Sequence, residues 1–224
     1  MKPIPFHTTH WSVVLAAKGD DTKAKAALRE LCESYREPML RYVEREIRTD
    51  SPQRYGGRNA EDLTHDFLAK LLEGKMFGNV QRLEGRFRTY LLGAVRHFLA
   101  NIRQRESAAK RSFSRYSANV DDISKTDDEA MFDRDWARAT IDRAIATLGN
   151  SQETQTLLPY LTSELTAEDR QQLAKELDKS ESAVKVALHR LRKKFRQHVR
   201  EQIARTVESE SDIDAELDYL IRAL

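Results

Sequence analysis

The stretch of sequence that decides the fold is Leu173-Ala-Lys-Glu-Leu-Asp-Lys-Ser-Glu-Ser-Ala-Val-Lys-Val-Ala-Leu-His-Arg-Leu-Arg-Lys-Lys-Phe-Arg196. Val184, Leu188 and Leu191 recur at steps of three and four, the pattern of an amphipathic helix. This helix begins at Glu181 and follows a helix over 168–177 after a turn of only three residues. The spacing predicts a helix-turn-helix, whose second helix enters the major groove of DNA by its N-terminal end.

The turn and the outer face of this segment support that prediction. Asp178 tolerates the left-handed conformation for which glycine is usual, and Ser180 is the expected N-cap of the second helix. If the apolar face is buried, the residues that face outward near the start of the helix are Ser182, Lys185, Val186, His189 and Arg190. Lys193, Lys194 and Arg196 lie further along, where we expect contacts with phosphates rather than bases.

The formal net charge of the chain is only +2, but its distribution is uneven. Residues 82–115 carry nine Lys or Arg and two acids, and residues 181–200 carry seven Lys or Arg and one acid. Residues 116–135 and 201–224 each carry seven acids and two bases. One basic run alone is often a solvated helix face. Two such runs in separate bodies indicate a polyanion that is contacted at two places.

The remaining sequence predicts an all-α protein. It has 33% charged residues, eight glycines and five prolines, which disfavours a strand-rich chain of tight turns. Helical periodicity runs through 23–47, 60–72 and 86–111, with Asn59 as an N-cap, and Pro38 should end or kink the first of these helices near Arg36. After residue 112 the composition becomes Ser-rich and then acidic, which predicts a flexible acidic linker between two helical domains.

Several classes of protein are disfavoured by the sequence. Its one cysteine, Cys32, excludes an intramolecular disulfide framework and a cysteine zinc site, and favours a reducing, cytoplasmic compartment. No apolar run is long enough for membrane insertion and no signal peptide is expected. His7-x-x-His10 lacks a third metal ligand, and no nucleophile–base pair or phosphate-binding loop is evident. We therefore expect no catalytic residue, no metal and no cofactor.

Three segments in one order resemble bacterial ECF (extracytoplasmic-function) sigma factors. The helix-turn-helix quoted above is similar to the motif that reads the promoter −35 element. Ala60-Glu-Asp-Leu-Thr-His-Asp-Phe-Leu-Ala-Lys-Leu-Leu72 resembles the helix that binds core polymerase, and Gly85-Arg-Phe-Arg-Thr-Tyr-Leu-Leu-Gly-Ala-Val-Arg-His-Phe-Leu-Ala-Asn101 resembles the −10 recognition and melting segment. Thr8-Thr-His-Trp-Ser-Val-Val14 is similar to the N-terminal signature of one subgroup.

The resemblance implies a sigma domain 2 over 1–112, the linker over 113–135, a sigma domain 4 over 136–200 and an acidic amphipathic tail over 201–224. It implies promoter-specific transcription initiation, with core RNA polymerase and promoter DNA as partners and an anti-sigma factor or another regulator as a third. The polymerase-binding positions would be Glu61, Asp62, Leu63, Asp66, Phe67, Lys70 and Leu71. The −10 positions would be Arg86, Arg88, Tyr90, Arg96, His97, Asn101, Arg103 and Arg105.

Three points stay open at the level of sequence. The chain could be a stand-alone helix-turn-helix repressor or activator, which would bind duplex operator DNA without polymerase. The apolar positions of Leu63, Phe67 and Leu71 could pack inward instead of contacting a partner. The tail is expected to pack on the second body or to mask its basic helix, or else to act as a capping helix that protects a core.

Overall fold

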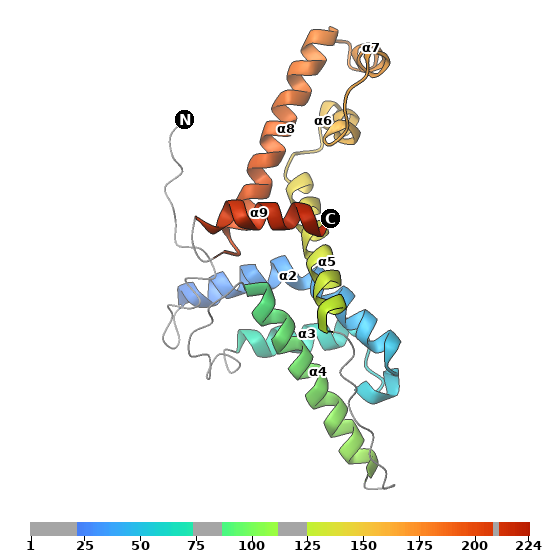
Figure 1. Cartoon of the computed structure of the whole chain (residues 1–224), viewed down its shortest axis with the longest axis vertical. Helices are drawn as coiled ribbons and strands as arrows, with labels where there is room; N and C mark the ends of the chain where they lie inside the picture. Colours follow the sequence, from blue (N-terminus) through green and yellow to red (C-terminus); the bar gives the residue numbers. More distant parts are fainter. Residues whose placement is uncertain (1–21, 74–86, 112–124, 208–210) are drawn as a thin grey trace. The chain divides into compact units, whose positions relative to one another are not determined.

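The computed structural model describes residues 22–73, 87–111, 125–207 and 211–224, and all regular structure within these ranges is helical (Figure 1). The all-α prediction is therefore confirmed. The α-helices are α2 (Thr22–Thr49), α3 (Ala60–Leu72), α4 (Phe87–Arg111), α5 (Lys125–Ala146), α6 (Gln152–Leu157), α7 (Ala167–Glu176), α8 (Glu181–Ala204) and α9 (Asp212–Ala223). Two short 3-10 helices are η1 (Pro52–Tyr55) and η2 (Leu158–Tyr160).

The chain divides into two compact units. Unit 1 contains the described residues up to Ala139 together with Ala204–Leu224, and unit 2 is Thr140–Ile203. The boundary at 139 lies close to the predicted start of the second domain at residue 136. Of the alternatives for the tail, packing on the second body does not occur, because α9 belongs to unit 1. A capping helix that protects a core fits this assignment.

The core of unit 1 forms where apolar faces of α2, α3, α4 and α5 are buried. The Phe67 and Phe98 rings lie 5.5 Å apart, and Tyr42 packs edge-on against Phe132 with ring centroids 6.1 Å apart. The largest fully buried side chains of this unit are Trp136, Tyr35, Tyr42, Tyr55, Phe67, Phe132, Leu31, Met39, Leu63 and Leu71. These residues recur at the helical spacing that the sequence shows, so the apolar stripes face inward.

Helix α2 continues through Pro38 to Thr49, so of the two predicted effects, an end or a kink near Arg36, the end does not occur. A proline inside a helix costs roughly 3 kcal/mol, because it removes one hydrogen bond and crowds the preceding turn. Here Tyr35 and Met39, on either side of the proline, are 1% and 0% exposed. Their burial in one core offsets the local cost and holds both halves helical.

The C-terminal part of the predicted linker is also helical. Helix α5 begins at Lys125, ten residues before the expected end of the linker at residue 135. Acidic residues near the start of a helix interact favourably with its dipole, so the acidic composition favours a helix here. Phe132 and Trp136 are then buried one turn apart. The first part of the linker, 113–124, lies outside the described residues.

Local signals for helix ends agree with the structure. The side chain of Asn59 accepts a hydrogen bond from the backbone N–H of Asp62 at 2.7 Å, as expected of an N-cap. Gly149 has a φ of 97°, a conformation that suits glycine just after the end of α5.

Cys32 is buried, and burial raises the pKa of its thiol to about 12. No helix in the described ranges is both long and apolar enough to cross a membrane.

Candidate nucleic-acid interface

The helix-turn-helix of unit 2 is formed by α7, a short turn and α8. Asp178 has a φ of +50°, so it takes the left-handed conformation that the sequence predicted for it. The backbone N–H of Lys179 donates to the Ala174 carbonyl at 2.9 Å and closes the end of α7. The Ser180 hydroxyl accepts from the backbone N–H of Ala183 at 3.2 Å and caps α8.

A small apolar core fixes α8 on the rest of unit 2. It consists of Leu148, Leu157, Leu173, Val184, Leu188 and Leu191. The three leucine and valine positions on α8 are those predicted to face inward. Because they anchor one side of α8 against α6 and α7, the opposite side is presented to solvent.

The outer side of α8 carries the predicted −35 residues. All eight are exposed: Ser182, Lys185, Val186, His189, Arg190, Lys193, Lys194 and Arg196. Val186 is 49% exposed, one of the few large apolar side chains that the described residues present to solvent. Lys185, Arg190, Lys193 and Arg196 form no ion pair with any described residue. Their charges are therefore available to an external polyanion.

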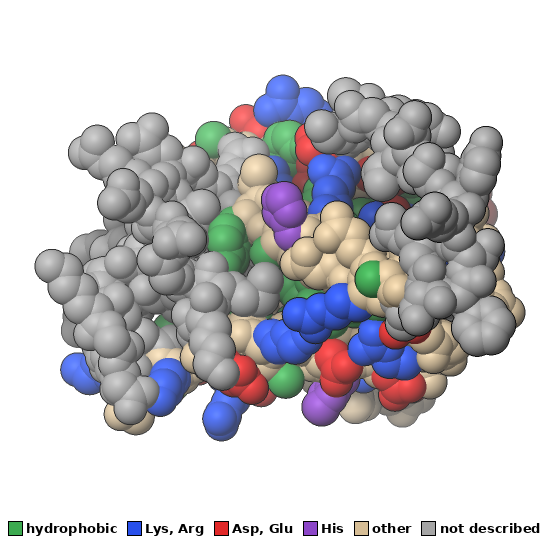
Figure 2. All heavy atoms as spheres, turned by 90° about the horizontal axis from the view of Figure 1, so that it is seen from below, with side chains coloured by type: hydrophobic (Ala, Val, Ile, Leu, Met, Phe, Trp, Pro, Cys, Tyr) green, Lys and Arg blue, Asp and Glu red, His purple; other side chains and the backbone are tan. Residues whose placement is uncertain are grey.

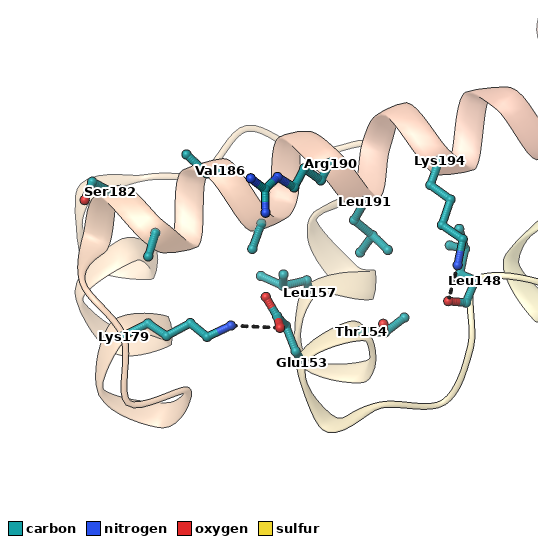
Figure 3. Close-up of a pocket in the computed structure, with 12 residues that line it drawn as sticks. Leu148, Glu153, Thr154, Leu157, Lys179, Ser182, Val186, Arg190, Leu191 and Lys194 are labelled. Carbon is teal, nitrogen blue, oxygen red and sulfur yellow. Dashed lines mark hydrogen bonds and ion pairs between the residues drawn. The ribbon is translucent and has the colours of Figure 1, made fainter.

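A groove of about 690 Å³ lies between α6 and α8 within unit 2 (Figure 3). Val186, Arg190 and Leu191 line it from α8, and Leu157 lines it from α6. At one end Lys179 Nζ lies 2.8 Å from a carboxylate oxygen of Glu153. At the other end the Lys194 ammonium donates to the Leu148 carbonyl at 3.1 Å. Lys194 thus makes a hydrogen bond within unit 2, although its side chain remains exposed to solvent.

Sequence reasoning missed the role of Arg192, which lies beside the interface. Its guanidinium donates to the carbonyl of Tyr160 at 2.8 Å and to that of Ser163 at 2.5 Å. These bonds attach the segment after η2 to α8. The partners are main-chain carbonyls some thirty residues away, so no local spacing signals them.

The basic residues of α4 are arranged differently from those of α8. On the face of the molecule in Figure 2, Lys and Arg side chains lie beside Asp and Glu side chains. The Arg96 guanidinium lies 3.2 Å from Glu129 and 3.7 Å from Asp128, both on α5. It is therefore paired within unit 1, and a contact with −10 DNA would have to replace these ion pairs.

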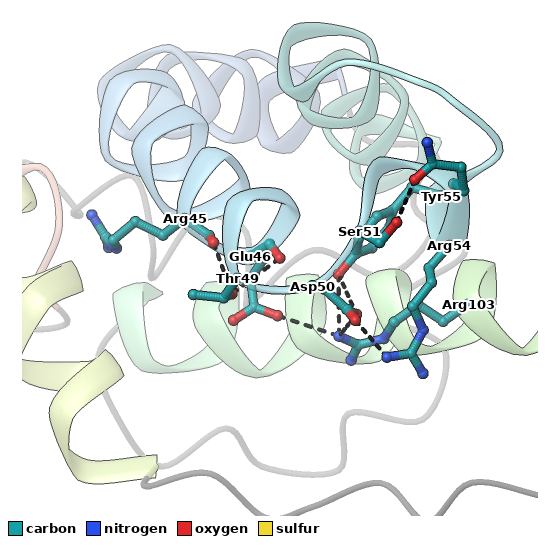
Figure 4. A network of polar contacts seen from close by, with 9 residues as sticks. Arg45, Glu46, Thr49, Asp50, Ser51, Arg54, Tyr55 and Arg103 are labelled. Atoms are coloured by element: carbon teal, nitrogen blue, oxygen red, sulfur yellow. Dashed lines mark hydrogen bonds and ion pairs between the residues drawn. The ribbon is translucent and has the colours of Figure 1, made fainter.

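Arg103 is likewise held in a polar network between α4 and the end of α2 (Figure 4). Its Nη1 lies 3.4 Å from Glu46 and 3.3 Å from Asp50, and donates to the Tyr55 hydroxyl at 3.2 Å. Burial lowers the pKa of Arg103, but Tyr55, Asp50 and Glu46 outweigh it and raise this pKa overall. Burial also raises the pKa of Tyr55 to about 12. In this structure Arg103 holds two helices together and is not a free DNA contact.

Arg88, at the start of α4, is the most deeply buried of the predicted −10 residues within the described ranges. Its side chain is 4% exposed and forms ion pairs with Asp133 of α5 and Glu216 of α9. The prediction that it faces DNA does not fit this conformation. A buried cation needs a partner, and the two carboxylates supply it.

Three predicted −10 residues remain exposed along one side of α4, one turn apart: His97, Asn101 and Arg105. Tyr90 is half-buried, and burial raises the pKa of its phenol to about 12. Arg86 and the expected base-capturing loop over 77–85 lie outside the described residues, as does the N-terminal signature over 8–14.

The predicted polymerase-binding helix α3 has two faces. Leu63, Phe67 and Leu71 are each 0% exposed, so they belong to the core of unit 1 and cannot form an exposed docking surface. Glu61, Asp62 and Lys70 are exposed, and Asp66 is half-buried beside Arg58 at 3.4 Å. Any surface that α3 offers to a partner is thus polar.

No group of three or more His, Cys, Asp or Glu among the described residues could hold a metal ion. Comparisons with known proteins add nothing to this geometry: no family model, no curated protein and no solved structure matches the chain.

Proposed function

We propose that the chain is a promoter-specificity subunit of bacterial RNA polymerase, a sigma factor of the ECF type. The observation that carries the proposal is the exposed face of α8, where Lys185, Arg190, Lys193 and Arg196 have no acidic partner among the described residues. This face lies on the second helix of a helix-turn-helix. Such a helix places its first turns in the major groove, and its later cations meet phosphates.

In this proposal the start of α8 reads the −35 element. Lys185 and Arg190 are long donors suited to guanine edges, Ser182 and His189 can donate or accept, and Val186 offers an apolar contact for a thymine methyl group. Lys193 and Arg196 contribute affinity that depends on salt but not on sequence.

Helix α4 would act on the −10 element through its exposed side. His97, Asn101 and Arg105 follow one another at single-turn spacing and combine a stacking ring, an amide and a cation. These are side-chain types that bind an opened strand by stacking, hydrogen bonding and charge. Since promoter DNA lies in the bacterial cytoplasm, the proposal also places the protein there.

The decisive experiment is transcription with purified components. The full chain is combined with core RNA polymerase and a genomic DNA library, and transcript starts are mapped. The proposal requires new starts that share −35 and −10 sequences, and Lys185→Ala or Arg190→Ala should reduce their use. Lys175→Ala is the matched control, because Lys175 is an exposed lysine on α7 and is not one of the proposed DNA-binding residues.

Absence of new starts, where a control sigma factor works, would contradict the proposal. Tight binding to a duplex operator without polymerase, together with no added starts, would instead favour the stand-alone helix-turn-helix regulator.

Polymerase binding is tested on the exposed face of α3. Glu61→Ala should weaken binding to core polymerase several-fold with little effect on stability, because its side chain is exposed. Lys70→Ala is less suitable, because the Lys70 ammonium lies 4.8 Å from the centroid of the Phe98 ring and its loss would also lower stability. Phe67→Ala is unsuitable for this test. Truncating such a buried ring costs roughly 3–5 kcal/mol of folding free energy, so lost binding would only report unfolding.

A further inference from the structure

Helix α9 packs into unit 1 through an apolar face that contains one carboxylate. Ile213, Glu216 and Leu220 are 4%, 1% and 2% exposed, and they lie three and four residues apart on one side of the helix. Burying an ion pair seldom stabilises a protein more than apolar residues of similar size would. A helix that served only as a cap would do as well with apolar residues at both positions of the pair, 88 and 216.

The partner of this carboxylate is Arg88. One guanidinium nitrogen of Arg88 pairs with Glu216, and Nε lies 2.8 Å from Asp133. The guanidinium carbon lies 4.6 Å from the ring centroid of Trp136 and 4.3 Å from that of Tyr219. The Tyr219 hydroxyl also donates to Asp133. Two residues of α9, Glu216 and Tyr219, therefore enclose Arg88.

The chemistry of this contact is that of an anion site. The guanidinium fork binds carboxylate and phosphate in the same planar, charge-assisted way. Arg88 lies in the first turn of α4, on the side that α5 and α9 cover, whereas the proposed −10 contacts His97, Asn101 and Arg105 lie on the exposed side of the same helix. Its Asp133 partner comes from α5 of the same unit. A DNA phosphate and Glu216 would thus compete for the same donors.

We propose that α9 is an autoinhibitory segment, in which Glu216 occupies the position on Arg88 that a phosphate of the opened −10 strand takes when α9 is released. This inference rests on the proposed function and specifies its regulation. Release of α9 removes Glu216 and Tyr219 together, which uncovers the Arg88 guanidinium beside the Trp136 ring. Binding of DNA and docking of α9 on unit 1 are then mutually exclusive.

The first test measures binding of the full chain to a short single-stranded DNA oligonucleotide over a range of salt concentrations. Glu216→Gln keeps the size of the side chain but removes its charge, and Asp133 still neutralises Arg88. We expect affinity to rise at least about fivefold, the lower end of ordinary coupling between sites. The slope of log affinity against log salt should steepen by about 0.7, the value for one added phosphate contact on a single strand.

The matched control is Asp218→Asn. It removes the same charge from the same helix, but Asp218 is exposed and has no ion pair with a described residue. It should change affinity only through weak long-range repulsion. In Arg88→Gln/Glu216→Gln the gain seen with Glu216→Gln should disappear, because the proposed phosphate contact is then absent.

A second measurement uses the unaltered protein. Coupling is reciprocal, so saturating single-stranded DNA should speed hydrogen exchange of the backbone amides in α9. Equal affinities for Glu216→Gln and Asp218→Asn, or α9 exchange unchanged by DNA, would overturn the autoinhibition. The proposed function is judged separately on duplex DNA, where Lys185→Ala should weaken binding whatever the state of α9. Duplex binding unaffected by Lys185→Ala would contradict the proposed function instead.

Discussion

Arg192 and Lys193 are adjacent on α8, yet their side chains lie in different surroundings. Arg192 donates to two main-chain carbonyls of the segment after η2, at 2.8 Å and 2.5 Å. Lys193 is exposed and has no ion pair with a described residue. One cation thus contributes to the stability of unit 2, whereas the next is available to a phosphate.

We therefore predict separable effects for Arg192→Ala and Lys193→Ala. Arg192→Ala should lower the free energy of unfolding by about 2 kcal/mol, since hydrogen bonds from a charged donor are lost. Lys193→Ala should leave stability unchanged and reduce the salt slope of duplex DNA binding by about 0.9. Urea unfolding and DNA titration measure the two quantities. Equal loss of stability in both variants would show that the assignment of Arg192 is mistaken.

At the scale of one element, α7 begins with a reciprocal pair of hydrogen bonds. The Thr166 hydroxyl accepts from the backbone N–H of Asp169 at 3.1 Å, and the Asp169 carboxylate accepts from the backbone N–H of Thr166 at 3.0 Å. The Asp169 carboxylate also accepts from the Thr166 hydroxyl at 2.7 Å. These bonds, the hydroxyl first, lower the pKa of Asp169 below its ordinary value of 3.8.

A lowered pKa in the folded state makes this contribution dependent on pH. Ionised Asp169 favours the fold above its unfolded pKa, and the contribution is lost as pH falls through the lower, folded pKa. Thr166→Ala should destabilise by about 1 kcal/mol near neutral pH, the usual cost of a lost N-cap. The difference between the unaltered protein and the variant should shrink on acidification, which urea unfolding at a series of pH values measures. A constant difference down to about pH 3 would contradict the prediction.

Helix positions follow from local signals wherever local chemistry and packing agree. Asn59, Ser180 and Asp178 take the predicted cap and turn conformations, because each acts through its own backbone neighbours. Pro38 does not end α2, because buried side chains on both sides of it hold the helix together. The acidic start of α5 was predicted to be linker from its composition alone. It is helical together with the buried residues Phe132 and Trp136 that follow it.

At the scale of the whole molecule, the net charge of a segment does not show how many of its basic side chains are paired with acids elsewhere in the fold. The segment over 82–115 has the larger net positive charge, but three of its arginines are neutralised by acids that lie far away in sequence. Glu129 is 33 residues from Arg96, and Glu216 is 128 residues from Arg88. Only tertiary packing brings such partners together. The exposure of the eight residues on α8 could be predicted because it follows from one helix, whereas the pairing on α4 could not.

This difference is testable on one helix with Arg103→Gln and Arg105→Gln. Arg103 is paired with Glu46 and Asp50, so its replacement should cost roughly 1–3 kcal/mol of stability, because its ion pairs with these two half-buried acids are lost. Arg105 is exposed, so its replacement should reduce the salt slope of single-stranded DNA binding by about 0.7 and spare stability. Thermal unfolding and salt titrations distinguish them. A reversed pattern would mean that the network in Figure 4 does not hold Arg103.

The burial of Cys32 has a practical consequence for spectroscopy. It is the one cysteine of the sequence, and its thiol is both enclosed and resistant to ionisation, with a pKa of about 12. Thiol-directed dyes and spin labels react through the thiolate on an accessible sulfur. A cysteine introduced at an exposed position such as Ile221 on α9 would therefore be labelled selectively in the folded protein. Cys32 therefore need not be replaced before a label at position 221 is used to follow α9 by fluorescence.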